Sequence, residues 1–446
     1  MKKTLAILGA VVIVASFSFL VQPGVAFGEG TSAADEPSRT INAANYTYCR
    51  TVTSNNNGYT DGIGTTTPLL FPLFASSTIS SLAATSSSGR IQLVSADEPT
   101  DIVFTDEASC SFSTSIDAIP HYFEKYASTT GEFSVHLGTS NISSTTAKTL
   151  AMYYGNSGAT NLNSPGQTFG TSSPMGIVSH WDLSVPGYAT TTSPDFTDST
   201  YNNNHGSSNA MNQADLVSGQ VDGSLDFDGT GDNVSVTDND SLDFGTGDMS
   251  ISVWIKPNSV ATQKQAIVDK TDGGTAAYRF ITSDSAGGGD RLKFIRGSPF
   301  AEGIQSNDNV LVAGVWQHIA AVVDTSGTDK VTFYVNGVAQ GSGNLANSSF
   351  TNANPLMIGQ KGYSGSSVVN FTGSIDDVRV YNRALSMADI QTIYNTTSKS
   401  SVFWTFGNEE TQSAPAGETA TPPRVMHLFE GFKIKLISGR LIIQQR

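Results

Sequence analysis

One stretch of the sequence, from Gly223 to Asn395, consists of an unbroken series of strand and turn signals. Within it, the apolar residues Ile251, Val253 and Ile255 occupy every second position, which is the two-residue period of a β-strand. The intervening Trp254 is also bulky, so both faces of this strand carry large side chains. We therefore expect a central strand of a β-sandwich.

The neighbouring segments predict how such strands pair. The apolar runs 318–323 and 331–335 are separated by a loop rich in Thr, Ser, Gly and Asp, so we expect antiparallel neighbours. Asn336-Gly337 follows, and both residues tolerate the positive φ of a tight hairpin turn. A single helix is predicted at 386–394, where Ser386 and Asp389 have the spacing of a helix start.

These segments also carry a family resemblance. The runs SLDFDGTGDNVSV, MSISVWIKP, VWQHIAAVVDTSGTDKVTFYVNGV and FTGSIDDVRVYNRALSMADI resemble the laminin-G-like jelly roll of the concanavalin A-like lectin and glucanase superfamily. The resemblance implies a jelly-roll domain over residues 175–397. It implies a style of binding and names no ligand.

Residues 40–163 form a second unit with a resemblance of its own. The runs TDIVFTDEASC, IPHYFEKYASTTGEFSVHL and TLAMYYGNSGAT are similar to the bacterial domain of unknown function 2341, which often precedes a laminin-G-like domain in surface proteins. Alternation in 101–104 and 133–137 predicts a small β-sandwich. The fold class is therefore all-β, with two β-sandwich domains, the second a concanavalin A-like jelly roll.

Both cysteines of the chain, Cys49 and Cys110, fall in the first unit. In an oxidising compartment they can close one disulfide, for which chain-entropy models give roughly 4 kcal/mol. The alternative is a pair of buried thiols, because the sequence does not show whether the two Cα atoms approach within about 7 Å.

The N-terminus predicts export. Lys2 and Lys3 precede an apolar core from Leu5 to Val21, and small residues at Ala26 and Gly28 suit a signal peptidase. We expect a helical signal peptide over residues 1–28 and a secreted or cell-surface protein. The alternative is an uncleaved anchor, which would be the chain's one contact with a membrane.

Three further segments differ in composition from the two units. Residues 164–174 and 407–423 are rich in small, polar and Pro residues, so we expect linkers, the second of them flexible. Residues 424–446 mix basic and apolar side chains around Ser438-Gly439, which predicts a short β-hairpin. The hairpin could pack on a domain or partner, or retain the protein on an acidic surface polymer.

Composition and motifs exclude several functions. A formal charge of -15 repels phosphate backbones, so we expect no nucleic-acid partner. The Glu-x-Asp-x-x-Glu strand of the superfamily's hydrolases is absent, so we do not expect an enzyme. Six scattered histidines give no zinc-binding spacing.

Calcium is the predicted cofactor, since laminin-G-like jelly rolls often hold one through carboxylates and carbonyls in turns. The candidate ligands are Asp198, Asp228, Asp376 and Asp377. The first and last strands of a jelly roll pair, so residues near 182–228 and near 376 could converge. The alternative is that these Asp residues only form turns.

Aromatic residues divide into core and surface candidates. Trp254 and Trp316 lie in strand-like runs and are expected in the core, as is His318. Tyr278 and Tyr363 lie near Gly-rich segments, and we expect them to offer exposed stacking surfaces to a ligand.

These observations favour a secreted or cell-surface binding or adhesion protein without catalysis, whose partner is a glycan or another surface protein. One alternative is a structural surface-layer or spacer protein. The other is a glycoside hydrolase, which would need two carboxylates about 5 to 9.5 Å apart in an open groove.

Overall fold

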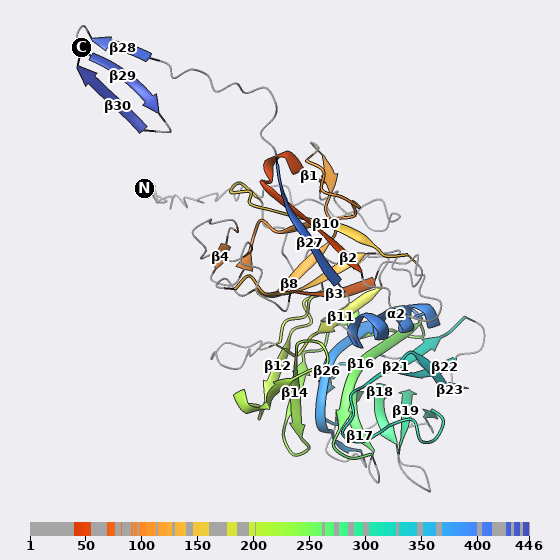
Figure 1. Ribbon diagram of the computed structural model, residues 1–446. Coiled ribbons are helices and arrows are strands. Elements are labelled where there is room, and N and C mark those ends of the chain that lie inside the picture. Colours follow the sequence, from red (N-terminus) through yellow and green to blue (C-terminus); the bar gives the residue numbers. More distant parts are fainter. Residues whose placement is uncertain are drawn as a thin grey trace, which may run out of the picture.

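The structure is a computed structural model. It describes residues 40–54, 69–75, 82, 91, 93–95, 98–112, 115–126, 130–139, 146–159, 176–184, 196–200, 202–260, 264–271, 276–283, 290–297, 303–326, 330–345, 351–362, 368–398, 404–412, 425–429, 432–437 and 440–445. The described chain is almost entirely β and forms two sandwich-like units, one stacked on the other (Figure 1).

The C-terminal unit is a sandwich of two sheets. The first, which we call the interface sheet, contains β11 (Ile177–Trp181), β13 (Leu216–Ser218), β14 (Gly223–Asp228), β16 (Met249–Pro257), β21 (Gln317–Asp324), β22 (Lys330–Val335), β23 (Val338–Asn344) and β26 (Thr372–Tyr381). The second, the outer sheet, contains β12 (Gly206–Asn209), β15 (Asn233–Val236), β17 (Gln265–Thr271), β18 (Ala276–Ser283), β19 (Arg291–Gly297), β20 (Ile304–Gln305), β24 (Leu356–Ile358) and β25 (Val369–Asn370).

The strand pairing agrees with the sequence pattern. Strand β16 lies between β21 and β26, which confirms it as central. Strands β21 and β22 are antiparallel neighbours, and β22 turns into β23 at Asn336 and Gly337, whose φ values are 50° and 78°. The last strand, β26, pairs with both β11 and β14, so the two ends of this unit do converge.

One apolar core fills the space between the two sheets. Ile251, Val253 and Ile255 of β16 enter it, together with Phe280 of β18 and Phe333 of β22. All five side chains are fully buried, because alternate residues of each strand point to the same face.

The N-terminal unit is built on two smaller sheets. One has the order β27–β2–β10–β6, with β27 (Trp404–Thr411), β2 (Tyr48–Ser54), β10 (Thr149–Tyr154) and β6 (Val103–Thr105). The other has the order β3–β9–β8, with β3 (Leu69–Ala75), β9 (Phe133–Thr139) and β8 (His121–Tyr126). Two short pairs complete it, β1 (Thr40–Ile41) with β7 (Ile116–Asp117) and β4 (Leu93–Ser95) with β5 (Glu98–Pro99).

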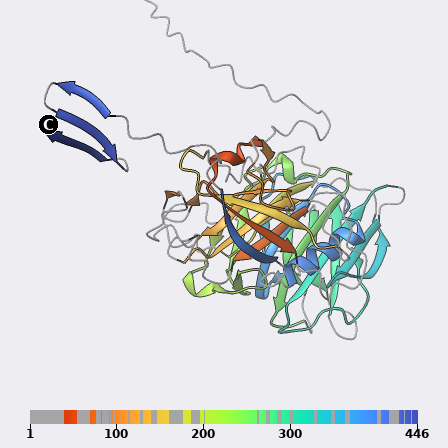
Figure 2. The same ribbon diagram turned by 45° about the horizontal axis from the view of Figure 1, so that its top comes forward.

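Strand β27 comes from the far end of the chain. After the jelly roll it returns to the N-terminal unit and pairs antiparallel with β2, beside which it lies in Figure 2. The flexible linker was predicted to begin at Gly407, and for residues 407–411 that prediction is wrong. An edge strand such as β2 has unpaired backbone N–H and C=O groups. Residues 404–411 pair with these groups, so this segment is part of the sheet.

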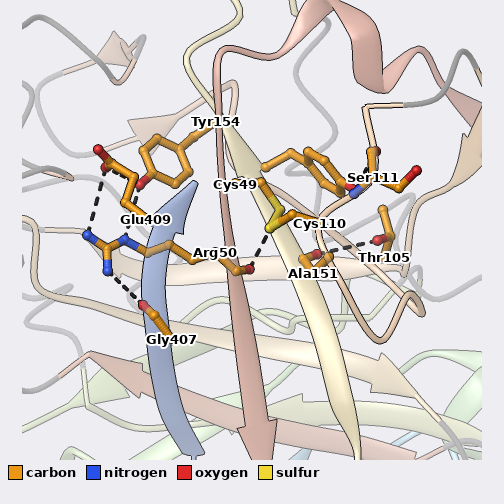
Figure 3. Close-up of a disulfide and its surroundings, with 10 residues drawn as sticks. Cys49, Arg50, Thr105, Cys110, Ser111, Ala151, Tyr154, Gly407 and Glu409 are labelled. Atoms are coloured by element: carbon orange, nitrogen blue, oxygen red, sulfur yellow. Dashed lines mark hydrogen bonds and ion pairs between the residues drawn. A yellow bond between two sulfur atoms is a disulfide. The ribbon is translucent and has the colours of Figure 1, made fainter. Parts of the chain in front are cut away.

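A disulfide and a polar cluster stabilise this sheet. The predicted bridge between Cys49 and Cys110 is present, with the two Cα atoms 5.8 Å apart (Figure 3). Arg50, the next residue, donates to the carbonyl of Gly407 at 2.9 Å and to the Tyr154 hydroxyl at 3.1 Å. That hydroxyl donates to Glu409 at 2.5 Å, so a side-chain network joins β2 and β10 to β27.

A helix, α2 (Met387–Ser398), lies between the two units. Ser386 and Asp389 exchange hydrogen bonds of 3.0 and 3.1 Å at its start, which confirms the predicted helix start. Ile390 and Ile393 of α2 join a second apolar cluster that also holds Tyr381 of the interface sheet and Leu73 of the N-terminal unit. The two units therefore share a continuous apolar contact.

Several predicted segments lie outside the described residues, namely the signal helix at 1–28, the linker at 164–174 and residues 413–424. None of the helices in the described part of the chain has the length and apolar character needed to cross a bilayer. The tail forms three antiparallel strands, β28 (Val425–Phe429), β29 (Phe432–Ile437) and β30 (Arg440–Gln445), one more than the predicted hairpin.

Candidate functional site

A group of buried polar side chains lies where the two units meet. Two of its members lie on a bulge in β26. Ile375 and Val378 both enter the core between the sheets, so two residues, Asp376 and Asp377, stand where regular alternation has one. The register with β16 shifts at this point, and Asp377 has a φ of 50°. The bulge thus accommodates two adjacent carboxylates, both fully buried.

Strand β11 brings a histidine to this bulge. The ring Nε2 of His180 donates to Oδ1 of Asp377 at 2.8 Å, and Nε of Arg379 donates to the same oxygen at 2.8 Å. All three side chains are fully buried. Within the described residues, the other ring nitrogen of His180, Nδ1, and the other oxygen of Asp377, Oδ2, have no hydrogen-bond partner.

The N-terminal unit contributes a second histidine. His136 lies on β9 between Val135 and Leu137, which point into the apolar cluster, so its own side chain takes the opposite face. Its Nε2 lies 3.3 Å from Oδ2 of Asp182, which follows β11. The rings of His136 and His180 meet edge to face, with centroids 4.6 Å apart.

His136, His180 and Asp182 together form a group with the composition of a metal site. A ring nitrogen of each histidine and a carboxylate oxygen of Asp182 all lie within 4.8 Å of one another, and all three residues are buried. These ligand atoms come from two different units of the fold.

Burial controls the charges in this group. Burial, followed by the nearby His136, lowers the pKa of His180 to about 3, so its imidazole is neutral at pH 7. Burial and then the charges of Asp182 and Asp377 raise the pKa of Asp376 well above its usual range. Burial alone would raise the pKa of Asp377 too, but Arg379 and His180 lower it below its usual range.

The four predicted calcium ligands do not converge on one point. Asp228 pairs with Thr372 in the β14–β26 register, and Asp376 lies four residues further along β26. At about 3.3 Å per residue that is roughly 13 Å, too far for a shared ion.

Most of their carboxylate oxygens already accept hydrogen bonds. Asp228 accepts from Thr230 and Gly231 in its own turn, and the bonds from Thr230 lower its pKa to about 2. Asp198 accepts from the backbone of His180, Thr200 and Asn204. These contacts fit the turn-forming role and leave calcium at these residues a prediction.

The structure confirms the predicted burial of some aromatic residues and contradicts the predicted exposure of another. Tyr278 is fully buried in the core between the sheets, so the prediction of an exposed stacking surface there is wrong. It stands two residues before Phe280 on β18 and therefore shares its inward face. Trp254 is buried as predicted, whereas Trp316 is only partly buried and precedes β21.

His318 is buried as predicted. It lies against the Trp254 ring and shares a 2.7 Å hydrogen bond with the Ser252 hydroxyl.

Tyr363 lies outside the described residues, but the base of its loop is described. The backbone N–H of Gly362 donates to Oδ2 of Asp269 at 3.0 Å, and Arg279 donates to the same oxygen at 2.6 Å. A Cβ at position 362 would meet the Oγ1 and carbonyl oxygen of Thr271 at 2.5 and 2.6 Å, so only glycine fits. Gly362 is therefore held against the buried ion pair of Asp269 and Arg279 on the outer sheet.

Sequence reasoning singled out Asp376 and Asp377 and missed the histidines beside them. His136 and His180 are 44 positions apart in the chain, so no short spacing relates them. One local signal was available. Adjacent aspartates between two inward-facing residues, Ile375 and Val378, break the two-residue period and indicate a bulge.

Comparison with known families finds a match within each of the two units. The family model described as "Concanavalin A-like lectin/glucanases superfamily" matches residues 228–391, and the model of the domain of unknown function 2341 matches residues 98–173. The two matches follow one another along the chain, the domain of unknown function 2341 first. The order agrees with the resemblance seen in the sequence. No curated protein matches the chain.

Several solved structures are similar to part of the chain. The binding domain of Paraclostridial Mosquitocidal Protein 1 is 18% identical over 50% of this chain, with a TM-score of 0.39, and 52% of its own length is covered. Domain 4 of AbnA, a GH43 extracellular arabinanase from Geobacillus stearothermophilus solved with arabinotriose, is 20% identical over 49% of this chain and 98% of its own, with a TM-score of 0.35.

The CBM40 of the Ruminococcus gnavus IT-sialidase, bound to alpha2,3 sialyllactose, is 15% identical over 34% of this chain and 84% of its own, with a TM-score of 0.28. The chain thus spans about half the length of the first of these structures. TM-scores this low support no inference about the ligand of the present protein.

Proposed function

We propose that this protein is exported and binds a glycan or a cell-surface protein through its laminin-G-like domain, without catalysis. The observation that carries the proposal is the match of residues 228–391 to a superfamily of lectins and glucanases. That superfamily leaves two functions open, binding and hydrolysis, and the placement of the carboxylates bears on the choice.

The carboxylates at the junction of the two units are unsuited to hydrolysis. Asp182, Asp376 and Asp377 lie together under the N-terminal unit and are 3%, 0% and 0% exposed. A glycosidase needs its two carboxylates on either side of a sugar bond in an open groove. Side chains this deeply covered cannot contact a polysaccharide, so this cluster is not a hydrolytic site.

The arrangement of the units favours one side of the jelly roll for recognition. The outward face of the interface sheet packs against α2 and the N-terminal unit through the shared apolar cluster. The outer sheet and its loops lie on the other side (Figure 1). We place the binding surface in these loops, with Tyr363 as the stacking residue, because the base of its loop is anchored by Asp269.

A glycan array with the full chain tests this function, in buffer with calcium and in buffer with a chelator. We expect binding to one class of glycan, and loss of binding in chelator would support calcium as the cofactor. Tyr363→Ala should weaken the binding about tenfold, which corresponds to about 1.4 kcal/mol, whereas Ser364→Ala in the same loop should not. Absence of binding in both buffers would favour a protein partner or a structural role.

A further inference from the structure

We propose that His136, His180 and Asp182 bind a divalent transition metal, Zn²⁺ by preference, at the junction of the two units. The site is distinct from the calcium expected of a jelly roll, because its ligands include two imidazoles and come from both domains. Imidazole nitrogen favours zinc and its neighbours in the periodic table, whereas calcium prefers oxygen ligands alone.

The first support is the hydrogen bonding of the two ring nitrogens of His180. Its Nε2 donates to Asp377, which fixes the tautomer and leaves the lone pair of Nδ1 available. That nitrogen is fully buried and has no hydrogen-bond partner among the described residues. A histidine that donates one nitrogen to a carboxylate and offers the other to a metal is the usual arrangement at zinc sites.

The second support is the distance between His136 and Asp182. Oδ2 of Asp182 lies 3.3 Å from Nε2 of His136. A charge-assisted N–H···O⁻ bond is shorter, about 2.7–2.9 Å. Two ligands about 2.0–2.1 Å from a tetrahedral zinc stand roughly 3.3 Å apart, so this pair has the spacing of one edge of such a site.

The third support is charge. Asp182 and Asp377 are buried carboxylates of this junction, and Asp377 accepts a hydrogen bond from Arg379. Buried carboxylates are retained only with compensating positive charge or donors. A divalent cation bound here would supply positive charge beside the buried carboxylate of Asp182.

Such a metal would cross-link the two units. His136 belongs to the N-terminal unit, and His180 and Asp182 belong to the jelly roll, so one ion would bind the two domains together. The sequence showed no zinc spacing because the ligands meet only after both domains have folded and docked.

The test measures metal content of the untagged full chain after chelator treatment, zinc loading and desalting. We expect about one Zn²⁺ per chain by elemental analysis, and a dissociation constant below about 1 μM by competition with a zinc indicator. His136→Gln and His180→Gln should each weaken zinc binding by at least about tenfold to a hundredfold. His318→Gln, a buried histidine outside the group, is the matched control and should bind zinc as the wild type does.

X-ray absorption of the zinc-loaded wild type keeps the test independent of how the variants fold. We expect a shell with two imidazole nitrogens and oxygen at about 2.0–2.1 Å. Absence of stoichiometric zinc, a shell without imidazole, or zinc retained in both histidine variants would each overturn the proposal.

Discussion

The two faces of the interface sheet are both dry, but they are stabilised in different ways. The face toward the outer sheet carries Ile251, Val253 and Val380 in a continuous apolar core. The opposite face carries His180, Asp377 and Arg379 under the N-terminal unit, and these are just as buried. Apolar packing needs only shape and volume, whereas a buried charge needs a specific partner at a specific atom. The second face therefore sets how the two units fit together.

The largest expected effect comes from breaking the charge pair on the polar face. Arg379→Met leaves Asp377 buried without its cation, and we expect a loss of about 3–5 kcal/mol in the free energy of unfolding, measured with urea. Arg379→Met combined with Asp377→Asn should lose less, because no unpaired charge remains. Equal losses in the single and double variants would contradict this account.

The apolar face should respond to loss of volume. Ile251→Ala removes buried methyl groups from the core and should cost about 2–5 kcal/mol in the same urea experiment. Val338→Ala, at a side chain that is 55% exposed, is the control and should change stability by less than about 0.5 kcal/mol. No second substitution should rescue Ile251→Ala as Asp377→Asn is expected to rescue Arg379→Met.

His318 gives the polar face a pH dependence that the apolar face lacks. Burial lowers its pKa to about 3, against about 6.5 in the unfolded chain, so the unfolded state binds more protons between these values. Its contribution to stability is complete above about pH 6.5 and is lost as the pH falls toward 3. Between these two pH values, His318 alone should contribute a fall in stability of about 1.4 kcal/mol per pH unit, and His318→Gln should reduce the total slope by about that amount. Identical slopes in urea titrations from pH 7 to 4 would argue against it.

The smallest expected effect concerns α2, which covers part of the polar face. Ser386→Ala removes the hydroxyl that accepts from the Asp389 backbone, and we expect a loss of about 1 kcal/mol. Thermal unfolding followed by circular dichroism would measure it. A loss as large as that of Arg379→Met would mean that the cap supports the whole interface.

Local patterns predicted most of the fold. The period of two located β16, the pair Asn336-Gly337 located the hairpin, and Ser386 with Asp389 located the helix start. The cysteine pair was also found, because two cysteines allow only one intramolecular bridge. Each of these signals depends on residues near one another in the chain or on simple counting.

The candidate site was predicted only in part. The sequence pointed to Asp376 and Asp377 as possible ligands, but the histidines near them come from other strands, and one of them from another domain. Tyr278 was misplaced because its Gly-rich surroundings suggested a surface loop, although Phe280 two residues later marks the buried face.

The sequence by itself determined which residues form strands, which share a face and where the chain turns, since these follow from backbone geometry over a few residues. Only the tertiary structure decided that β27 completes the N-terminal sheet, that the second face of the interface sheet is covered, and that His136 meets His180. The physical reason is that alternation defines two faces for every strand, but burial of each face depends on which distant segment packs against it.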